Sequence, residues 1–240
     1  MPELLTKKHL EKAFEEVNSM RTSPKSRILS WEHCMAQFSS VFDDIKNGKT
    51  TAETTPDERV DYLCLHLGFF LASWGMMRGS TDLLDYDYKV HIPAVKTILK
   101  YPHLFRLDFL TPHSESEWED LENFSADLRL AYTSEEKQQR PLPNMTDTLV
   151  TKIIMGTMGI VPAYDNFVKE AVKYYGITTA NFNITSFKKF SEYFSTHFVS
   201  EIKEYTKAMQ SYCPLYTRTK VIDVLLWCLG KEIAKQKSSK

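Results

Sequence analysis

Hydrophobic residues in this chain recur at steps of three and four almost everywhere, the spacing that places side chains on one face of an α-helix. The clearest run extends from Ile28 to Ile45, and Gly48 follows it at a natural helix-ending position. A second run extends from Phe187 to Met209. No stretch of alternating apolar and polar residues is flanked by turn residues. The pattern predicts an all-α fold of about nine or ten helices.

Prolines and capping residues indicate where other helices begin. Pro56 precedes a long helix through the apolar run from Tyr62 to Met77, and Pro93 stands near the start of a helix reaching about Lys100. An acidic helix is predicted from Ser114 to about Ala131, after Thr111 and Pro112. A final helix is predicted over about 217–234.

Composition favours a globular protein without a membrane segment. Of 240 residues, 42% are hydrophobic, enough for a sizeable core. The longest apolar run, Tyr62 to Met77, is shorter than the roughly 20 residues needed to cross a bilayer. No export signal is evident, and four dispersed cysteines without a CxxC pair read as reduced. We therefore expect a cytoplasmic protein with no membrane partner, no metal site and no cofactor.

The polar stretch over 133–144 contains Pro141 and Pro143 and is the best candidate for a boundary. It predicts two helical lobes, residues 1–140 and 144–240, packed around one cleft, although a single domain is an alternative.

The net charge of −1 hides an asymmetry between the two parts of the chain. Residues 166–240 carry twelve Lys and Arg against six Asp and Glu, so they carry +6 and the rest −7. The C-terminal part could present a basic face to DNA, or these lysines could simply solvate helices.

Glycines are scarce, and three of the eight fall near the end of one predicted helix. Gly68, Ala72, Gly75 and Gly79 step by 4, 3 and 4, which lines small residues along one helix face. Each glycine inside a helix costs about 0.5–1 kcal/mol relative to alanine, so we expect a compensating close contact. Either another helix packs there or a ligand approaches.

The segment over 73–91 mixes aromatic and polar residues most densely. Trp74 and Arg78 are four residues apart, so the guanidinium can lie over the indole or bind an anion. The segment could form a pocket wall that ends at His91, or Arg78 could only hold the following loop through Asp82 or Asp85. Established motifs such as HExxH, GxSxG and the phosphate-binding P-loop are absent.

The segment over 151–172 joins two predicted helices. Thr146 is a natural cap for the first helix, Gly156 and Gly159 flank a tight connection, and Pro162 fits the first turn of the second. Asp165 would then lie in that first turn, where the helix dipole stabilises a carboxylate. We expect such a hairpin to expose backbone N–H groups to a phosphate.

Together, the helix, the GxxG-type hairpin, the following helix and Val-Pro-x-x-Asp at its start resemble the helix-hairpin-helix superfamily of DNA glycosylases. The resemblance covers about 25 residues and implies two all-α lobes around a cleft, a hairpin that grips DNA, and an aspartate that attacks the glycosidic bond of a flipped base. The loop lacks the lysine of bifunctional members, which implies a monofunctional enzyme. The implied residues are Asp165 for catalysis; Trp74, Arg78, Tyr164, Lys152 and His91 for the substrate; and Gly156, Thr157 and Gly159 for the DNA backbone.

Two other functions fit the same sequence. The chain could be a non-enzymatic helical module that binds a protein partner or oligomerises through the small-residue face. It could also be an enzyme acting on a small molecule, with Arg78 and Asp165 as an anion site. For a glycosylase, defence against modified phage DNA would be a suitable role. The spacing of Asp165 also fits an ordinary residue at a helix start.

Overall fold

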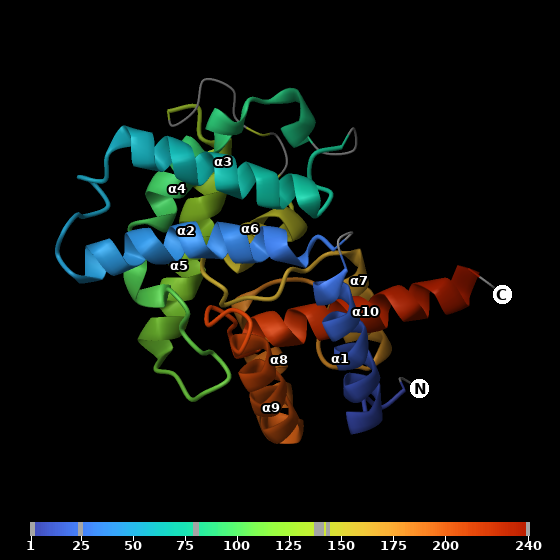
Figure 1. Cartoon of the computed structure of the whole chain (residues 1–240). Helices are drawn as coiled ribbons and strands as arrows, with labels where there is room; N and C mark the ends of the chain where they lie inside the picture. Colours follow the sequence, from blue (N-terminus) through green and yellow to red (C-terminus); the bar gives the residue numbers. More distant parts are fainter. Residues whose placement is uncertain (1–2, 24–25, 79–81, 137–141, 143–144, 239–240) are drawn as a thin grey trace.

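A computed structural model describes residues 3–23, 26–78, 82–136, 142 and 145–238 (Figure 1). Within these ranges the chain forms ten α-helices and three short 3-10 helices, with no strand, so the all-α expectation is confirmed. The elements are α1 (Lys7–Thr22), α2 (Ile28–Lys46), α3 (Asp57–Ser73), η1 (Asp82–Asp85), η2 (Tyr88–His91), α4 (Ile92–Ile98), η3 (Pro102–Leu104), α5 (Glu115–Thr133), α6 (Asp147–Thr157), α7 (Asn166–Tyr174), α8 (Ile184–His197), α9 (Val199–Gln210) and α10 (Arg218–Ser238).

Local capping explains several helix ends. The Ser114 side chain accepts a hydrogen bond from the Glu117 N–H, and the Glu117 carboxylate accepts one from the Ser114 N–H, which begins α5. The Thr146 side chain accepts a hydrogen bond from the Leu149 N–H and so caps α6. Gly48 follows α2 with φ of 69°, a left-handed conformation that glycine adopts without strain. These three ends were predicted from the sequence.

Two predicted helices differ from the structure. The run from Phe187 to Met209 forms α8 and α9, because the chain leaves helical geometry at Phe198 while its hydrophobic spacing continues unbroken. The helix after Pro162 begins only at Asn166. The N–H groups of Ala163 and Tyr164 donate to the side chains of Asp223 on α10 and Thr151 on α6, not to backbone carbonyls, so this stretch is not helical.

The predicted helix face of small residues does not continue beyond Ser73, because α3 ends there. Gly68 lies on α3 and faces Tyr88 and His91, so a neighbouring element already covers it. Gly75 lies past the helix end with φ of 75°. Gly79 falls outside the described residues. The face therefore does not form a continuous helical surface for oligomerisation.

Packing crosses the proposed lobe boundary. α1 and α7 both lie against α10, and α2 packs on α3 and α6 (Figure 1). The buried side chains of all these helices belong to one core cluster. The division into two lobes stays a prediction, and part of the boundary at 133–144 lies outside the described residues. No helix in the described ranges is both long enough and apolar enough to cross a bilayer.

The start of α7 approaches the middle of α10 very closely. A Cβ atom added at Gly230 would lie 1.9 Å from the carbonyl oxygen of Phe167 and 2.5 Å from its carbonyl carbon. These are backbone atoms, so no side-chain rotation can relieve the overlap. Only glycine allows the two helices to meet at this separation.

We therefore expect Gly230→Ala to lower the free energy of unfolding by about 2 kcal/mol or more, because the methyl group would force α7 away from α10. Chemical denaturation of the purified variant measures this change.

Gly68→Ala is the matched control, since Gly68 is also helical but its added Cβ would lie 3.6 Å or more from its nearest neighbours. The control should match the wild type or gain up to about 1 kcal/mol through helix propensity. Equal stability of the two variants would contradict a constraint at Gly230.

Candidate functional site

A pocket of about 500 Å³ opens where five segments of the chain meet. These segments are the residue before α2, the stretch after α3, the start of α6, the start of α7 and the middle of α10. The lining residues are Arg27, Trp74, Gly75, Met76, Arg78, Thr146, Thr148, Lys152, Asp165, Asn166, Phe167, Lys169 and Trp227. Positive charges outnumber negative ones here, with four cations against a single carboxylate.

Asp165 is the single acid of this pocket and is fixed by the start of α7. It occupies the N-cap position, and its Oδ1 accepts hydrogen bonds from the N–H groups of Phe167 at 3.0 Å and Val168 at 3.1 Å. The sequence predicted Asp165 within the first helical turn that begins at Pro162, whereas the structure places it just before a helix that begins at Asn166. Burial raises the pKa of the Asp165 carboxyl above its ordinary value, while Lys152 and the two backbone donors oppose that rise.

Lys152 projects from α6 into the same region. Its Nζ donates to the Trp74 carbonyl oxygen at 2.6 Å and lies 3.8 Å from Asp165 Oδ2. The side chain is only 6% exposed. Burial lowers the pKa of Lys152, and the carboxylate of Asp165 partly offsets this effect. A buried amine and a buried acid therefore face each other, a combination common at functional sites.

Two tryptophans form the apolar wall. The rings of Trp74 and Trp227 meet edge to face, with centroids 5.8 Å apart and an interplanar angle of 85°. The Arg27 guanidinium lies 5.5 Å from the Trp74 ring and 5.8 Å from the Trp227 ring. It also donates to the Ser73 carbonyl oxygen at 3.3 Å. Arg27 thus joins the start of α2 to the end of α3 and leaves a cation beside both indoles.

The remaining two cations come from different segments. Lys169, on α7, donates to the Thr148 hydroxyl at 3.3 Å. Arg78 follows α3 and is exposed, and its charge acts on Lys152 together with that of Arg27. Cations therefore surround the pocket on several sides, an arrangement that favours an anionic ligand.

Of the nine predicted site residues, the structure brings four together and places five elsewhere. Asp165, Lys152, Trp74 and Arg78 all line the pocket. The two remaining substrate-binding candidates and the three hairpin residues lie in the core.

His91 is fully buried, and its Nδ1 lies 2.6 Å from the Tyr132 hydroxyl. Burial lowers the pKa of His91 to about 4, so it is a neutral core residue. Tyr164 is also fully buried, with its ring 5.6 Å from that of Phe182. Neither side chain lines the pocket, so the prediction that they contact substrate there is wrong for this arrangement.

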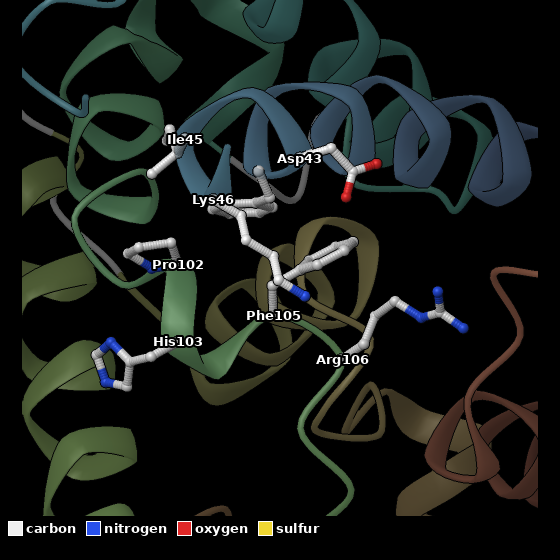
Figure 2. Close-up of a pocket in the computed structure, with 8 residues that line it drawn as sticks. Asp43, Ile45, Lys46, Pro102, His103, Phe105 and Arg106 are labelled. Atoms are coloured by element: carbon white, nitrogen blue, oxygen red, sulfur yellow. The ribbon is translucent and has the colours of Figure 1, made fainter. Parts of the chain in front are cut away.

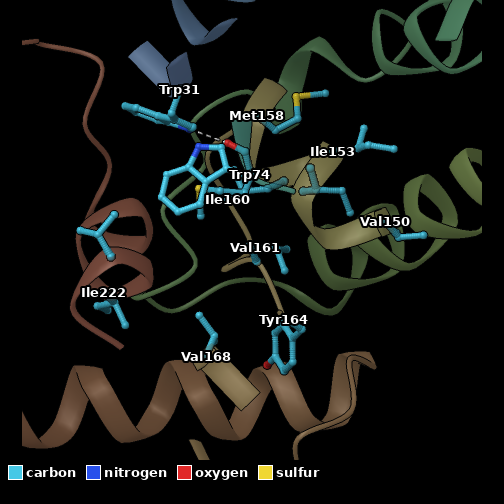
Figure 3. Close-up of a cluster of buried hydrophobic side chains, with 14 of the residues drawn as sticks. Trp31, Trp74, Val150, Ile153, Met158, Ile160, Val161, Tyr164, Val168 and Ile222 are labelled. Carbon is cyan, nitrogen blue, oxygen red and sulfur yellow. Dashed lines mark hydrogen bonds between the residues drawn. The ribbon is translucent and has the colours of Figure 1, made fainter. Parts of the chain in front are cut away.

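The predicted DNA-gripping hairpin is also wrong, because its residues are buried. Gly156 lies within α6, where an added Cβ would be 2.4 Å from the Phe70 ring. The Thr157 hydroxyl donates to the Ile153 carbonyl oxygen, and Gly159, with φ of 72°, packs against Met35 and Thr217. Figure 3 shows the neighbouring apolar side chains of this segment within the core. The residues that follow α6 therefore expose no backbone N–H groups to a phosphate.

Sequence reasoning missed several lining residues. Arg27 and Trp227 are far from Trp74 in sequence, and no spacing rule connects them. A signal did exist in α10, where Lys220 and Asp223 interrupt an otherwise apolar helix three residues apart. Charged residues are almost never fully buried unless paired, so such a pair within an apolar helix indicates a buried polar site.

A larger pocket of about 690 Å³ lies between the end of α2 and the segment around η3 (Figure 2). Its charged or titratable residues Asp43, Lys46 and His103 are exposed. Arg106 there has φ of 59°, and its guanidinium donates to the Pro214 carbonyl oxygen at 2.8 Å. The smaller pocket is the better candidate, because only it combines a buried acid with a buried amine.

Comparison of the chain with models of protein families, with curated proteins and with solved structures finds no match. Among the residues that the structure describes, no group of three or more His, Cys, Asp or Glu side chains could hold a metal ion. The pocket must therefore be interpreted from its own geometry.

We expect Asp165→Asn to reveal the burial of this acid through the pH dependence of stability. Asparagine caps a helix about as well as aspartate, so the start of α7 is retained. Because folding raises the pKa of Asp165, the folded protein binds more protons than the unfolded chain, from the ordinary value of 3.8 up to the raised one. The wild type should lose stability relative to the variant as pH rises through this window.

Urea denaturation of both proteins at closely spaced pH values measures this difference. A stability difference that stays constant from pH 4 to neutral pH, or that changes in the opposite direction, would contradict the raised pKa.

Proposed function

We propose that this pocket is the active site of a DNA glycosylase-like enzyme, which hydrolyses the N-glycosidic bond of a damaged or modified base. The observation that supports the proposal most is the buried carboxylate of Asp165, which lines the same pocket as Trp74 and Arg78. A glycosylase requires an acid, an aromatic surface and a phosphate-binding cation at one site.

The size and the wall of the pocket suit a base removed from the double helix. Pockets of roughly 300–1,000 Å³ accommodate small-molecule ligands. The indoles of Trp74 and Trp227 and the adjacent Arg27 guanidinium offer apolar and cationic surfaces against which a planar base can stack. Enzymes that act on a base within duplex DNA flip it into such a pocket.

Asp165 is suited to the chemical step. As the C1′–N bond breaks, its electron pair leaves with the base, and positive charge develops on the sugar. A carboxylate stabilises this oxocarbenium-like state or orients the attacking water, whose oxygen bonds to C1′ while its proton passes to the carboxylate and from there to the departing base. The Lys152 ammonium, 3.8 Å from the carboxylate, can hold the departing base or a phosphate.

The cations around the pocket suit the DNA backbone. Arg27, Arg78 and Lys169 line it from three segments, and guanidinium and ammonium groups bind phosphate oxygens. This arrangement replaces the hairpin that the resemblance implied. We propose double-stranded DNA as the partner, with defence against modified phage DNA as a fitting role. A small-molecule enzyme would use the same groups, and the assay below separates the two.

We expect the wild-type protein to release a base from at least one class of duplex oligonucleotide. The panel contains alkylated purines, oxidised purines, deaminated bases and pyrimidines with bulky 5-substituents, and alkaline strand cleavage scores the abasic sites. Asp165→Asn should slow release by about 10²–10⁴-fold, the usual contribution of a positioned acid or base. Binding to the duplex should persist, because the surrounding cations are unchanged.

Asp61→Asn is the matched control. It makes the same chemical change at an aspartate outside the pocket, whose two carboxylate oxygens accept hydrogen bonds from the Tyr88 hydroxyl. It should retain full activity. Equal base release by wild type and Asp165→Asn would remove Asp165 from catalysis, and release from no duplex in the panel would favour the small-molecule alternative.

A further inference from the structure

A second, much smaller cavity of about 10 Å³ adjoins the pocket. It shares Trp74, Lys152, Asp165 and Trp227 with the pocket, and Lys220 and Asp223 of α10 complete its polar lining. Asp165 therefore faces two sets of charged groups: cations toward the pocket and an ion pair toward the core. The proposed catalytic role of Asp165 does not involve this inner pair.

Lys220 and Asp223 form a buried ion pair within α10. Lys220 Nζ donates to Asp223 Oδ2 at 2.8 Å, and the side chains are only 2% and 6% exposed. The ammonium also lies 5.2 Å from the ring centroids of both Trp31 and Trp74. Removing two charges from water costs several kcal/mol of desolvation free energy per ion, and the attraction between the two charges often does not offset this cost. Such a pair calls for a structural or functional explanation.

Asp223 has a second contact that leads directly to Asp165. Its other oxygen, Oδ1, accepts a hydrogen bond from the Ala163 N–H at 2.8 Å. The Ala163 carbonyl oxygen then accepts from the Asp165 N–H at 2.7 Å. From the other side, Thr151 on α6 accepts from the Tyr164 N–H at 2.9 Å. The three residues leading into α7 are thus held between α10 and α6.

We propose that Asp223, held in place by Lys220, is a positioning residue for Asp165: its hydrogen bond to Ala163 fixes the segment that presents Asp165. The catalytic consequence rests on the proposed function, but the physical link between the two acids does not. Asp223 touches neither the base nor the sugar in this scheme.

The charges facing Asp165 come from every packed element. Lys152 approaches from α6 and lowers the pKa of Asp165, whereas Asp223 on α10 raises it, in the same direction as burial. Arg27 and Arg78 act on Lys152 from the start of α2 and the end of α3. Lys169 lies on α7, which Asp165 caps, and Lys220 on α10 places its positive charge beside Asp223. Removing Asp223 alone therefore deletes the one neighbouring acid of this set.

The test is a ¹³C NMR titration of the aspartate carboxyl groups, with Asp165→Asn used to assign the Asp165 signal. In Asp223→Asn the amide oxygen can still accept from Ala163, while the negative charge is lost. We expect the titration midpoint of Asp165 to move to lower pH than in the wild type. An unchanged or higher midpoint would overturn the electrostatic link.

Because Asp223→Asn leaves Lys220 buried without its partner, the single variant could unfold. The double variant Lys220→Met/Asp223→Asn removes both charges and keeps the acceptor for Ala163, a type of replacement that proteins often tolerate. Its proper reference is Lys220→Met, from which it differs only by the loss of the Asp223 charge, so its Asp165 midpoint should lie at lower pH than in Lys220→Met. An equal or higher midpoint would overturn the electrostatic link.

Asp223→Ala in the same Lys220→Met background tests the positioning role. It removes the acceptor, so the Ala163 amide should exchange with solvent faster than in Lys220→Met/Asp223→Asn. Base release should fall by about 100-fold relative to that double variant, the loss expected when a reacting group shifts by about 1 Å. Unchanged exchange of Ala163 would overturn the positioning role.

The pH profile of base release connects the two proposals. If ionised Asp165 is the active form, loss of the Asp223 charge moves the acidic limb of kcat/KM to lower pH, which a purely structural role would not do. Should no duplex be cleaved, the proposed function fails, but the NMR titration and amide exchange still decide whether Asp223 governs Asp165.

Discussion

One face of α10 holds the site together. Lys220, Asp223, Trp227 and Gly230 step by three, four and three residues, so they align along one side of the helix. Lys220 places a cation against two indoles, and Asp223 accepts a hydrogen bond from the Ala163 N–H. Trp227 forms part of the aromatic wall, and Gly230 allows the backbone of α7 to approach closely. The position of the pocket, of its acid and of the helix that presents the acid all depend on this face.

Backbone hydrogen bonding explains why that face carries charge inside a core. The chain between α6 and α7 is buried but not helical, so its N–H groups need acceptors that a helix would otherwise supply. Asp223 and Thr151 are two such acceptors, for Ala163 and Tyr164. An apolar helix could not supply them, and an unmade hydrogen bond in the core costs about 1–3 kcal/mol. The polar residues of α10 are thus a requirement of the path that the chain takes.

The sequence predicted the helices far better than the tertiary contacts between them. Helical spacing and capping residues such as Ser114 and Thr146 located most helices, because these signals are local. The same reasoning failed at Phe198, where the spacing continues through a helix break, and at Pro162, whose fitness for a helix start was overridden by the distant Asp223.

The candidate site was likewise predicted only where local sequence gave a signal. Trp74, Arg78, Lys152 and Asp165 stood out by residue type, and the fold brings them to one pocket. Arg27 and Trp227 have no local sequence signal, because only tertiary packing brings them to the pocket. His91 and the Gly156–Gly159 connection looked functional for the opposite reason: a titratable ring and paired glycines also serve a tightly packed core.

The N-cap position of Asp165 has a consequence for protein engineering. Asparagine and serine cap helices about as well as aspartate, and neither carries a charge that must be buried. A campaign that ranks variants by thermal resistance alone should therefore replace this aspartate early, and the product would fold well without the single carboxylate that lines the pocket. The residue that favours stability differs from the one that this chain carries, so stability screens of this protein need a second criterion at position 165.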